Sequence, residues 1–105
     1  GEYHSPVSFK DRDQTWVNSQ SPQGYTIELT EGDKASQVAQ VLYNAPKGNR
    51  MAQVKYERDG KTHYKGVYGT YSNAEEAQKA LNALPPDIKN SASVINWSNV
   101  QQYSP

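Results

Sequence analysis

The stretch from Met51 to Leu84 reads MAQVKYERDGKTHYKGVYGTYSNAEEAQKALNAL and contains the pattern that decides the fold. Apolar and polar residues alternate on both sides of Asp59-Gly60, and Asp-Gly between two alternating runs predicts a β-hairpin with a type I′ turn. Asn73 then begins a helical pattern, with Glu76 three residues later in the arrangement of a capping box. A hairpin that continues into a helix is half of a split βαβ unit.

The residues before this stretch predict the other half of that unit. Tyr25, Ile27 and Leu29 alternate with polar residues, which predicts a half-buried strand. Apolar residues at i, i+3, i+4 and i+7 then predict an amphipathic helix over about residues 33–44, with Asp33 as its candidate N-cap. The other predicted elements are strands near residues 52–57, 62–68 and 93–100, and a helix from residue 73 to the Pro85-Pro86 pair.

The predicted order is β-α-β-β-α-β, which indicates an α+β ferredoxin-like (RNP-like) sandwich. Each helix carries one apolar stripe, so both helices are expected on one face of a four-stranded antiparallel sheet, with the other face open. Tyr56, Tyr64 and Tyr68 are then expected on the helix-covered face as core, whereas the opposite register would let them stack on a ligand. Strand alternation places the following residues on the open face: Glu28, Gln53, Lys55, Glu57, His63, Lys65 and Val67.

The distribution of proline, glycine and polar residues predicts the domain boundaries. Residues 1–24 have no sustained period and are interpreted as an N-terminal linker or arm, followed by one domain at 25–102 and a tail at 103–105. Trp16 is the exception in the arm. Either it folds back onto the domain, or it anchors a partner.

The composition indicates a small binding module rather than an enzyme. Only 34% of the 105 residues are hydrophobic and none is cysteine, so an enclosed cofactor pocket and thiolate chemistry are not expected. The 11 basic and 11 acidic residues balance, which argues against a nucleic-acid partner. His63 has only His4, in the arm, as a second histidine, so we expect no metal site and no cofactor.

Several segments, in order and with matching spacing, resemble the bacterial SPOR (sporulation-related repeat) domain. Gly24-Tyr25-Thr26-Ile27-Glu28-Leu29 is similar to its opening strand, and Arg58-Asp59-Gly60-Lys61-Thr62-His63-Tyr64 is similar to its hairpin. The similarity continues through Val67-Tyr68-Gly69-Thr70-Tyr71, Glu75-Glu76-Ala77, the Leu84-Pro85 exit and Val100-Gln101. Together with the segment around Trp16, these features are most similar to the DamX-like cell-division type.

The resemblance implies a non-catalytic, periplasmic module of the bacterial cell envelope that binds denuded peptidoglycan glycan strands at the division septum. It implies a parent protein held in the inner membrane or by a lipid, with divisome proteins as further candidate partners and no direct membrane contact by this domain. The expected ligand-binding residues on the open face are Glu28, Gln53, His63, Lys65 and Trp97.

Three departures from the SPOR pattern bear on that site. Glu28 replaces a glutamine and cannot donate a hydrogen bond, and His63 replaces a tryptophan and offers less stacking area. The usual Pro-Trp pair before the last strand is missing, and Trp97 stands about four residues later, as either an aromatic platform or a core residue.

Two alternative functions remain open at this point. The departures favour a diverged SPOR fold that serves as a protein-interaction module in the envelope. RNA binding is a distant third, because Tyr64-Lys65-Gly66-Val67-Tyr68-Gly69 is only loosely similar to the aromatic motif of RNA-recognition domains.

Overall fold

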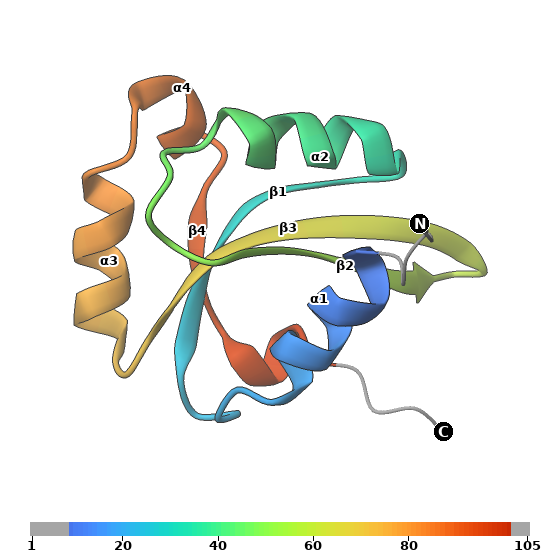
Figure 1. Ribbon diagram of the computed structural model, residues 1–105, viewed down its shortest axis with the longest axis horizontal. Helices are drawn as coiled ribbons and strands as arrows, with labels where there is room; N and C mark the ends of the chain where they lie inside the picture. Colours follow the sequence, from blue (N-terminus) through green and yellow to red (C-terminus); the bar gives the residue numbers. More distant parts are fainter. Residues whose placement is uncertain (1–8, 102–105) are drawn as a thin grey trace, which may run out of the picture.

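A four-stranded antiparallel sheet with the strand order β2-β3-β1-β4 forms the centre of the molecule (Figure 1). The computed structural model describes the backbone of residues 9–101 and the side chains of residues 14–101. The predicted α+β sandwich is confirmed. The elements are α1 (Phe9–Asn18), β1 (Tyr25–Gly32), α2 (Ala35–Asn44), β2 (Met51–Arg58), β3 (Lys61–Tyr71), α3 (Ala74–Asn82), α4 (Pro86–Lys89), β4 (Ser93–Asn96) and the 3₁₀ turn Trp97–Asn99.

The β2–β3 hairpin forms as the Asp-Gly signal predicts. Asp59 and Gly60 both have positive φ angles, 53° and 78°, which is the backbone conformation that a type I′ turn requires. β2 and β3 then pair without a register shift, from Arg58 opposite Lys61 to Met51 opposite Tyr68. The hairpin is therefore long and regular, and each residue of β2 has a defined partner on β3.

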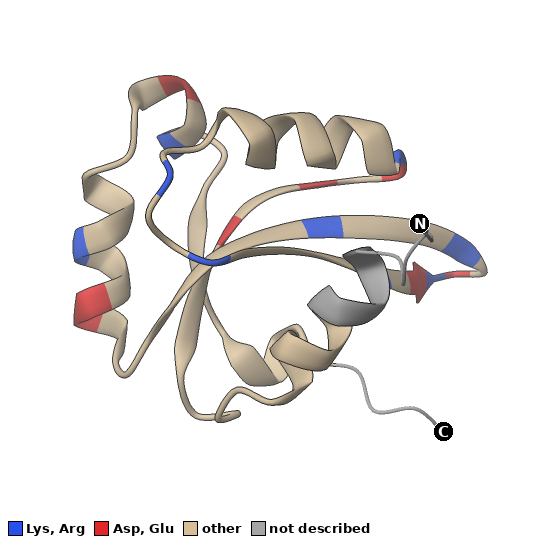
Figure 2. Ribbon diagram, in the orientation of Figure 1, with Lys and Arg blue, Asp and Glu red and all other residues tan. Residues whose placement is uncertain are grey.

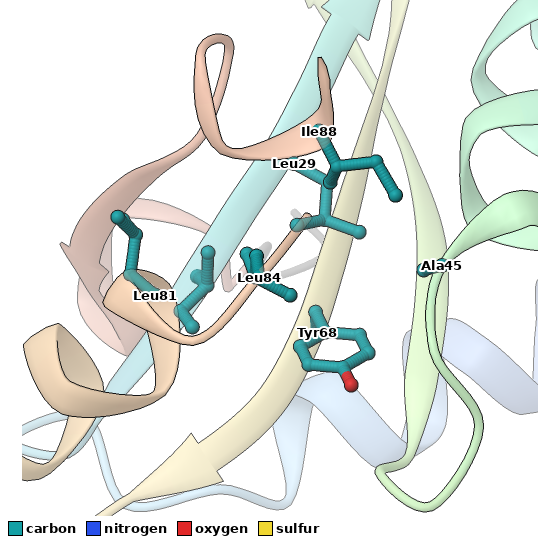
Figure 3. Close-up of a cluster of buried hydrophobic side chains, with 7 residues drawn as sticks. Leu29, Ala45, Tyr68, Leu81, Leu84 and Ile88 are labelled. Carbon is teal, nitrogen blue, oxygen red and sulfur yellow. The ribbon is translucent and has the colours of Figure 1, made fainter. Parts of the chain in front are cut away.

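One face of the sheet, here called the α2 face, is covered by α2, α3 and α4. Its buried cluster contains Ile27 and Leu29 from β1 and Tyr68 from β3, packed against residues of the helices (Figure 3). Gly66 lies on this face, where a Cβ atom would be 3.0 Å from Leu42 of α2. The glycine within the strand thus allows α2 to approach the sheet closely.

The opposite face of the sheet, here called the α1 face, is partly covered by a helix and partly exposed. α1 lies against β2 on this side and contributes Val17, which is fully buried (Figure 1). A second buried cluster forms between α1, the hairpin and the C-terminal turn. It consists of Val17, Ala52, Val54, Val67, Trp97 and Val100.

The side chains of β2 therefore alternate in the opposite sense to the prediction. Ala52 and Val54 belong to the second cluster on the α1 face. Gln53, expected on the open face, pairs with Gly66 and so lies on the α2 face, as do Lys55 and Glu57 by alternation. The expectation that Tyr56 joins Tyr68 on the α2 face is wrong for the same reason. The apolar residues of β2 fill a second core, which the prediction of two helices on one face did not include.

One helix end agrees with the prediction from the sequence, and two helix ends differ from it. Asn73 caps α3, because its side-chain oxygen accepts a hydrogen bond from the Glu76 backbone N–H (2.9 Å). Asp33 does not cap α2, since Lys34 occupies the N-cap position and makes no side-chain cap bond. The helix expected to reach the proline pair ends at Asn82, and Pro86 begins α4.

The segment interpreted as an arm contains the helix α1. Trp16 folds back onto the domain and meets Trp97 edge-on, with ring centroids 5.4 Å apart at an interplanar angle of 88°. Arg50 lies over the Trp16 ring at 4.9 Å. Residues 1–8 of the expected arm, with His4, and the expected tail at 103–105 lie outside the described residues.

Candidate functional site

The part of the α1 face that α1 leaves uncovered holds three of the five residues predicted for the site. Glu28, His63 and Lys65 lie together there, on the two central strands β1 and β3. Gln53 lies on the α2 face, so it is not part of this group. Trp97 is fully buried, which answers the open question about this residue in favour of the core.

His63 stacks on Tyr56, its direct cross-strand partner on β2. The two ring centroids are 5.5 Å apart, with an interplanar angle of 23°, and both residues are half-buried. Because the pair sits on a regular hairpin, the two residues face each other directly across the strands. Tyr56 was not predicted as a site residue, although its position opposite His63 across an Asp-Gly turn was a usable signal.

Lys65 connects this aromatic pair to Glu28. Its Nζ atom lies 3.2 Å from a Glu28 carboxylate oxygen and 5.1 Å from the centre of the Tyr56 ring. The two charged side chains are only 17% and 20% exposed. A cation held by a carboxylate and an aromatic ring at the same time has a restricted position. Lys65 and Glu28 therefore form the less exposed floor of the site.

Arg58 and Glu31 form a second ion pair at the outer end of the site. Arg58 Nη2 lies 3.4 Å from Glu31 Oε2, and the side chains are 58% and 31% exposed. The guanidinium also lies 5.5 Å from the Tyr56 ring centre and donates a hydrogen bond to the Tyr56 hydroxyl (3.4 Å). Register shifts in β1 between Glu28 and Thr30 allow both carboxylates to face this side. Figure 2 shows the acidic positions of β1 and two basic positions on β3, one in the middle of the strand and one near the hairpin turn.

We call these six residues the hairpin platform: Glu28, Glu31, Tyr56, Arg58, His63 and Lys65. Its two carboxylates and two cations cancel in formal charge. A groove of about 380 Å³ runs beside it, between β2 and the C-terminal segment. The residues lining the groove are Val54, Tyr56, Glu57, Arg58, Lys65, Asn99, Val100 and Gln101.

Trp97 has a structural role that its sequence position did not reveal. Its indole Nε1 donates a hydrogen bond to Thr70 Oγ1 (3.0 Å), and Thr70 Oγ1 donates to Gln20 Oε1 (3.1 Å). The ring thus joins the C-terminal turn to β3 and to the segment after α1. The aromatic surface of the site comes from Tyr56 and His63 instead.

The aromatic pair of the platform can stack against the apolar face of one ring of a ligand. The charged side chains around the pair can exchange hydrogen bonds with groups at the edge of that ligand ring. Each carboxylate of the platform is paired with a cation, so neither is placed as one of two facing acids across a substrate. Within the described part of the chain, no group of three or more His, Cys, Asp or Glu residues could hold a metal ion. No helix among the described residues is long and apolar enough to cross a membrane.

Comparisons with protein-family models, with curated proteins and with solved structures found no match for this chain.

Proposed function

We propose that this chain is a non-catalytic peptidoglycan-binding module of the bacterial cell envelope, which recognises glycan strands stripped of their peptide stems at the division septum. The hairpin platform carries the proposal. Tyr56 and His63 offer a stacked aromatic surface beside two ion pairs, and such a surface suits a polymer of sugar rings rich in hydroxyl groups.

The groove supports an extended ligand rather than a small enclosed one. It is open to solvent, and it is bordered by polar side chains from both the hairpin and the C-terminal segment, including Arg58 and Asn99. A saccharide stacks its apolar ring face on an aromatic side chain, while its hydroxyls require donors and acceptors at the rim. The SPOR resemblance in the hairpin points to the same class of ligand, and to a periplasmic location.

Sedimentation of the purified chain with sacculi tests this proposal. One sacculus preparation keeps its stem peptides, and the other has been treated with an amidase that removes them. We expect the chain to sediment with the stripped preparation only. Tyr56→Ala and His63→Ala should each weaken that binding about tenfold or more, because each removes half of the stacked pair.

Tyr43→Ala is the matched control, since Tyr43 is an exposed tyrosine of α2 (74% exposed) away from the platform. It should leave sedimentation unchanged, and circular dichroism should show that all the variants keep their secondary structure. If the unaltered chain binds neither preparation, the proposal is wrong. The protein-interaction alternative is then tested by affinity purification from envelope extracts.

A further inference from the structure

We infer that Arg58 binds the free carboxylate that the amidase leaves on a stripped glycan strand. This inference rests on the proposed function and deepens it, because it names the chemical group that the site distinguishes. The amidase hydrolyses the amide between the lactyl group of N-acetylmuramic acid and the first amino acid of the stem. Each stripped residue therefore carries a carboxylate where an intact one carries a neutral amide.

Arg58 is the accessible cation of the groove. The other platform cation, Lys65, is only 17% exposed and is held at 3.2 Å by Glu28 and over the Tyr56 ring. Arg58 is 58% exposed, and its ion pair with Glu31 is longer, at 3.4 Å. Exposed ion pairs contribute little net free energy, so a ligand carboxylate can replace Glu31 at small cost.

The guanidinium is also the suitable group for this ligand. It presents N–H donors in a planar fork that matches both oxygens of a carboxylate, and such charge-assisted pairs are stronger than neutral hydrogen bonds. The guanidinium lies over the Tyr56 ring and donates a hydrogen bond to its hydroxyl, so it directly borders the aromatic pair. A saccharide bound against this aromatic pair would have the guanidinium within reach of its lactyl carboxylate.

The test compares amidase-stripped glycan strands with the same strands after carbodiimide coupling to ammonia, which converts the lactyl carboxylates to neutral carboxamides. We expect the chain to bind the carboxylate form about tenfold more tightly. Arg58→Gln should bind both forms equally, at the level of the carboxamide. Glu31→Gln should bind the carboxylate form more tightly than the unaltered chain, because it removes the internal competitor.

Lys79→Gln on α3 is the matched control, because it removes the same charge from the opposite side of the sheet and should keep the preference. Equal binding of both forms by the unaltered chain would overturn the role of Arg58 and leave glycan binding intact. An unchanged preference in Arg58→Gln would have the same consequence. Binding of neither form would overturn the proposed function, and this inference with it.

Discussion

At the scale of single residues, Gly69 and Tyr71 form the most constrained point of the hairpin. Gly69 has a φ angle of 76°, and a Cβ atom there would collide with the Tyr71 hydroxyl, so only glycine fits. The Tyr71 hydroxyl is buried and has no hydrogen-bond partner within the described part of the chain. Burial raises the pKa of Tyr71 above its usual value, and the neighbouring Tyr68 adds to the rise.

The raised pKa of Tyr71 predicts a loss of stability at alkaline pH. The fold favours the neutral phenol, so its contribution is fully present below the unfolded pKa of about 10 and is lost as the pH rises beyond it. Tyr71→Phe cannot ionise there, and it also removes an unpartnered hydroxyl. Its free energy of unfolding should therefore exceed that of the unaltered chain by an amount that grows with alkaline pH.

Urea denaturation at several pH values between about 8 and about 11 measures this difference, since the other tyrosines are common to both chains. A difference that stays constant over this range would contradict the assigned environment of Tyr71.

At the scale of elements, the start of α3 was predictable from sequence, and the start of α2 was not. Both helices have a candidate capping residue before the first apolar position. Asn73 accepts the hydrogen bond of an N-cap, whereas Asp33 lies one residue too early and Lys34 takes the cap position. A shift of one residue moves a side chain out of reach of the first helical N–H groups, and short-range pattern does not resolve such shifts.

The two positions therefore give a matched pair of substitutions. Asn73→Ala should lower the free energy of unfolding by about 1 kcal/mol, because an N–H of the first turn of α3 loses its acceptor. Asp33→Ala should change it by less than about 0.5 kcal/mol, since this exposed side chain makes no cap bond to α2. Equilibrium denaturation of both variants measures the contrast. Equal losses of unfolding free energy in the two variants would show that α2 and α3 do not differ in side-chain capping at their N-termini.

At the scale of the whole molecule, the sheet separates two cores, one under α2, α3 and α4 and one under α1. The second core includes residues from both ends of the described chain. Val17 packs there with Val100, and Gln101 Nε2 donates a hydrogen bond to the Val17 carbonyl (3.1 Å). Because β2 and β3 contribute to this cluster as well, the side chains of α1 pack with those of three other segments, which are β2, β3 and the C-terminal turn.

This arrangement predicts that α1 unfolds together with the sheet. Trp16 and Trp97 are the only tryptophans, and both belong to the second core, so tryptophan fluorescence reports on that core alone. The urea midpoints measured by fluorescence and by far-ultraviolet circular dichroism should coincide. A fluorescence midpoint at lower urea would show that the α1 face opens before the rest of the fold. Tyr71→Phe, which lies outside this core, should shift both midpoints equally.

The sequence by itself determined the order of the four strands with α2 and α3, the type I′ turn and the cap of α3. Each of these depends on residues that are neighbours along the chain, such as Asp59 and Gly60 in the turn. It also identified Glu28, His63 and Lys65 as residues of one face, because β1 and β3 have a clear alternation that matches the packing of α2 and α3.

Only the tertiary structure decided which face β2 presents, and with it the composition of the hairpin platform. A period of two says that Ala52, Val54 and Tyr56 share a face, but it does not say which layer covers that face. The polar sequence of α1 did not predict a helix that supplies a second layer with Val17 as its buried residue, although folding back of Trp16 was one of the two interpretations of this segment. That layer draws Ala52 and Val54 inward, leaves Tyr56 beside His63, and buries Trp97, because apolar surface is stabilised wherever a covering segment excludes water.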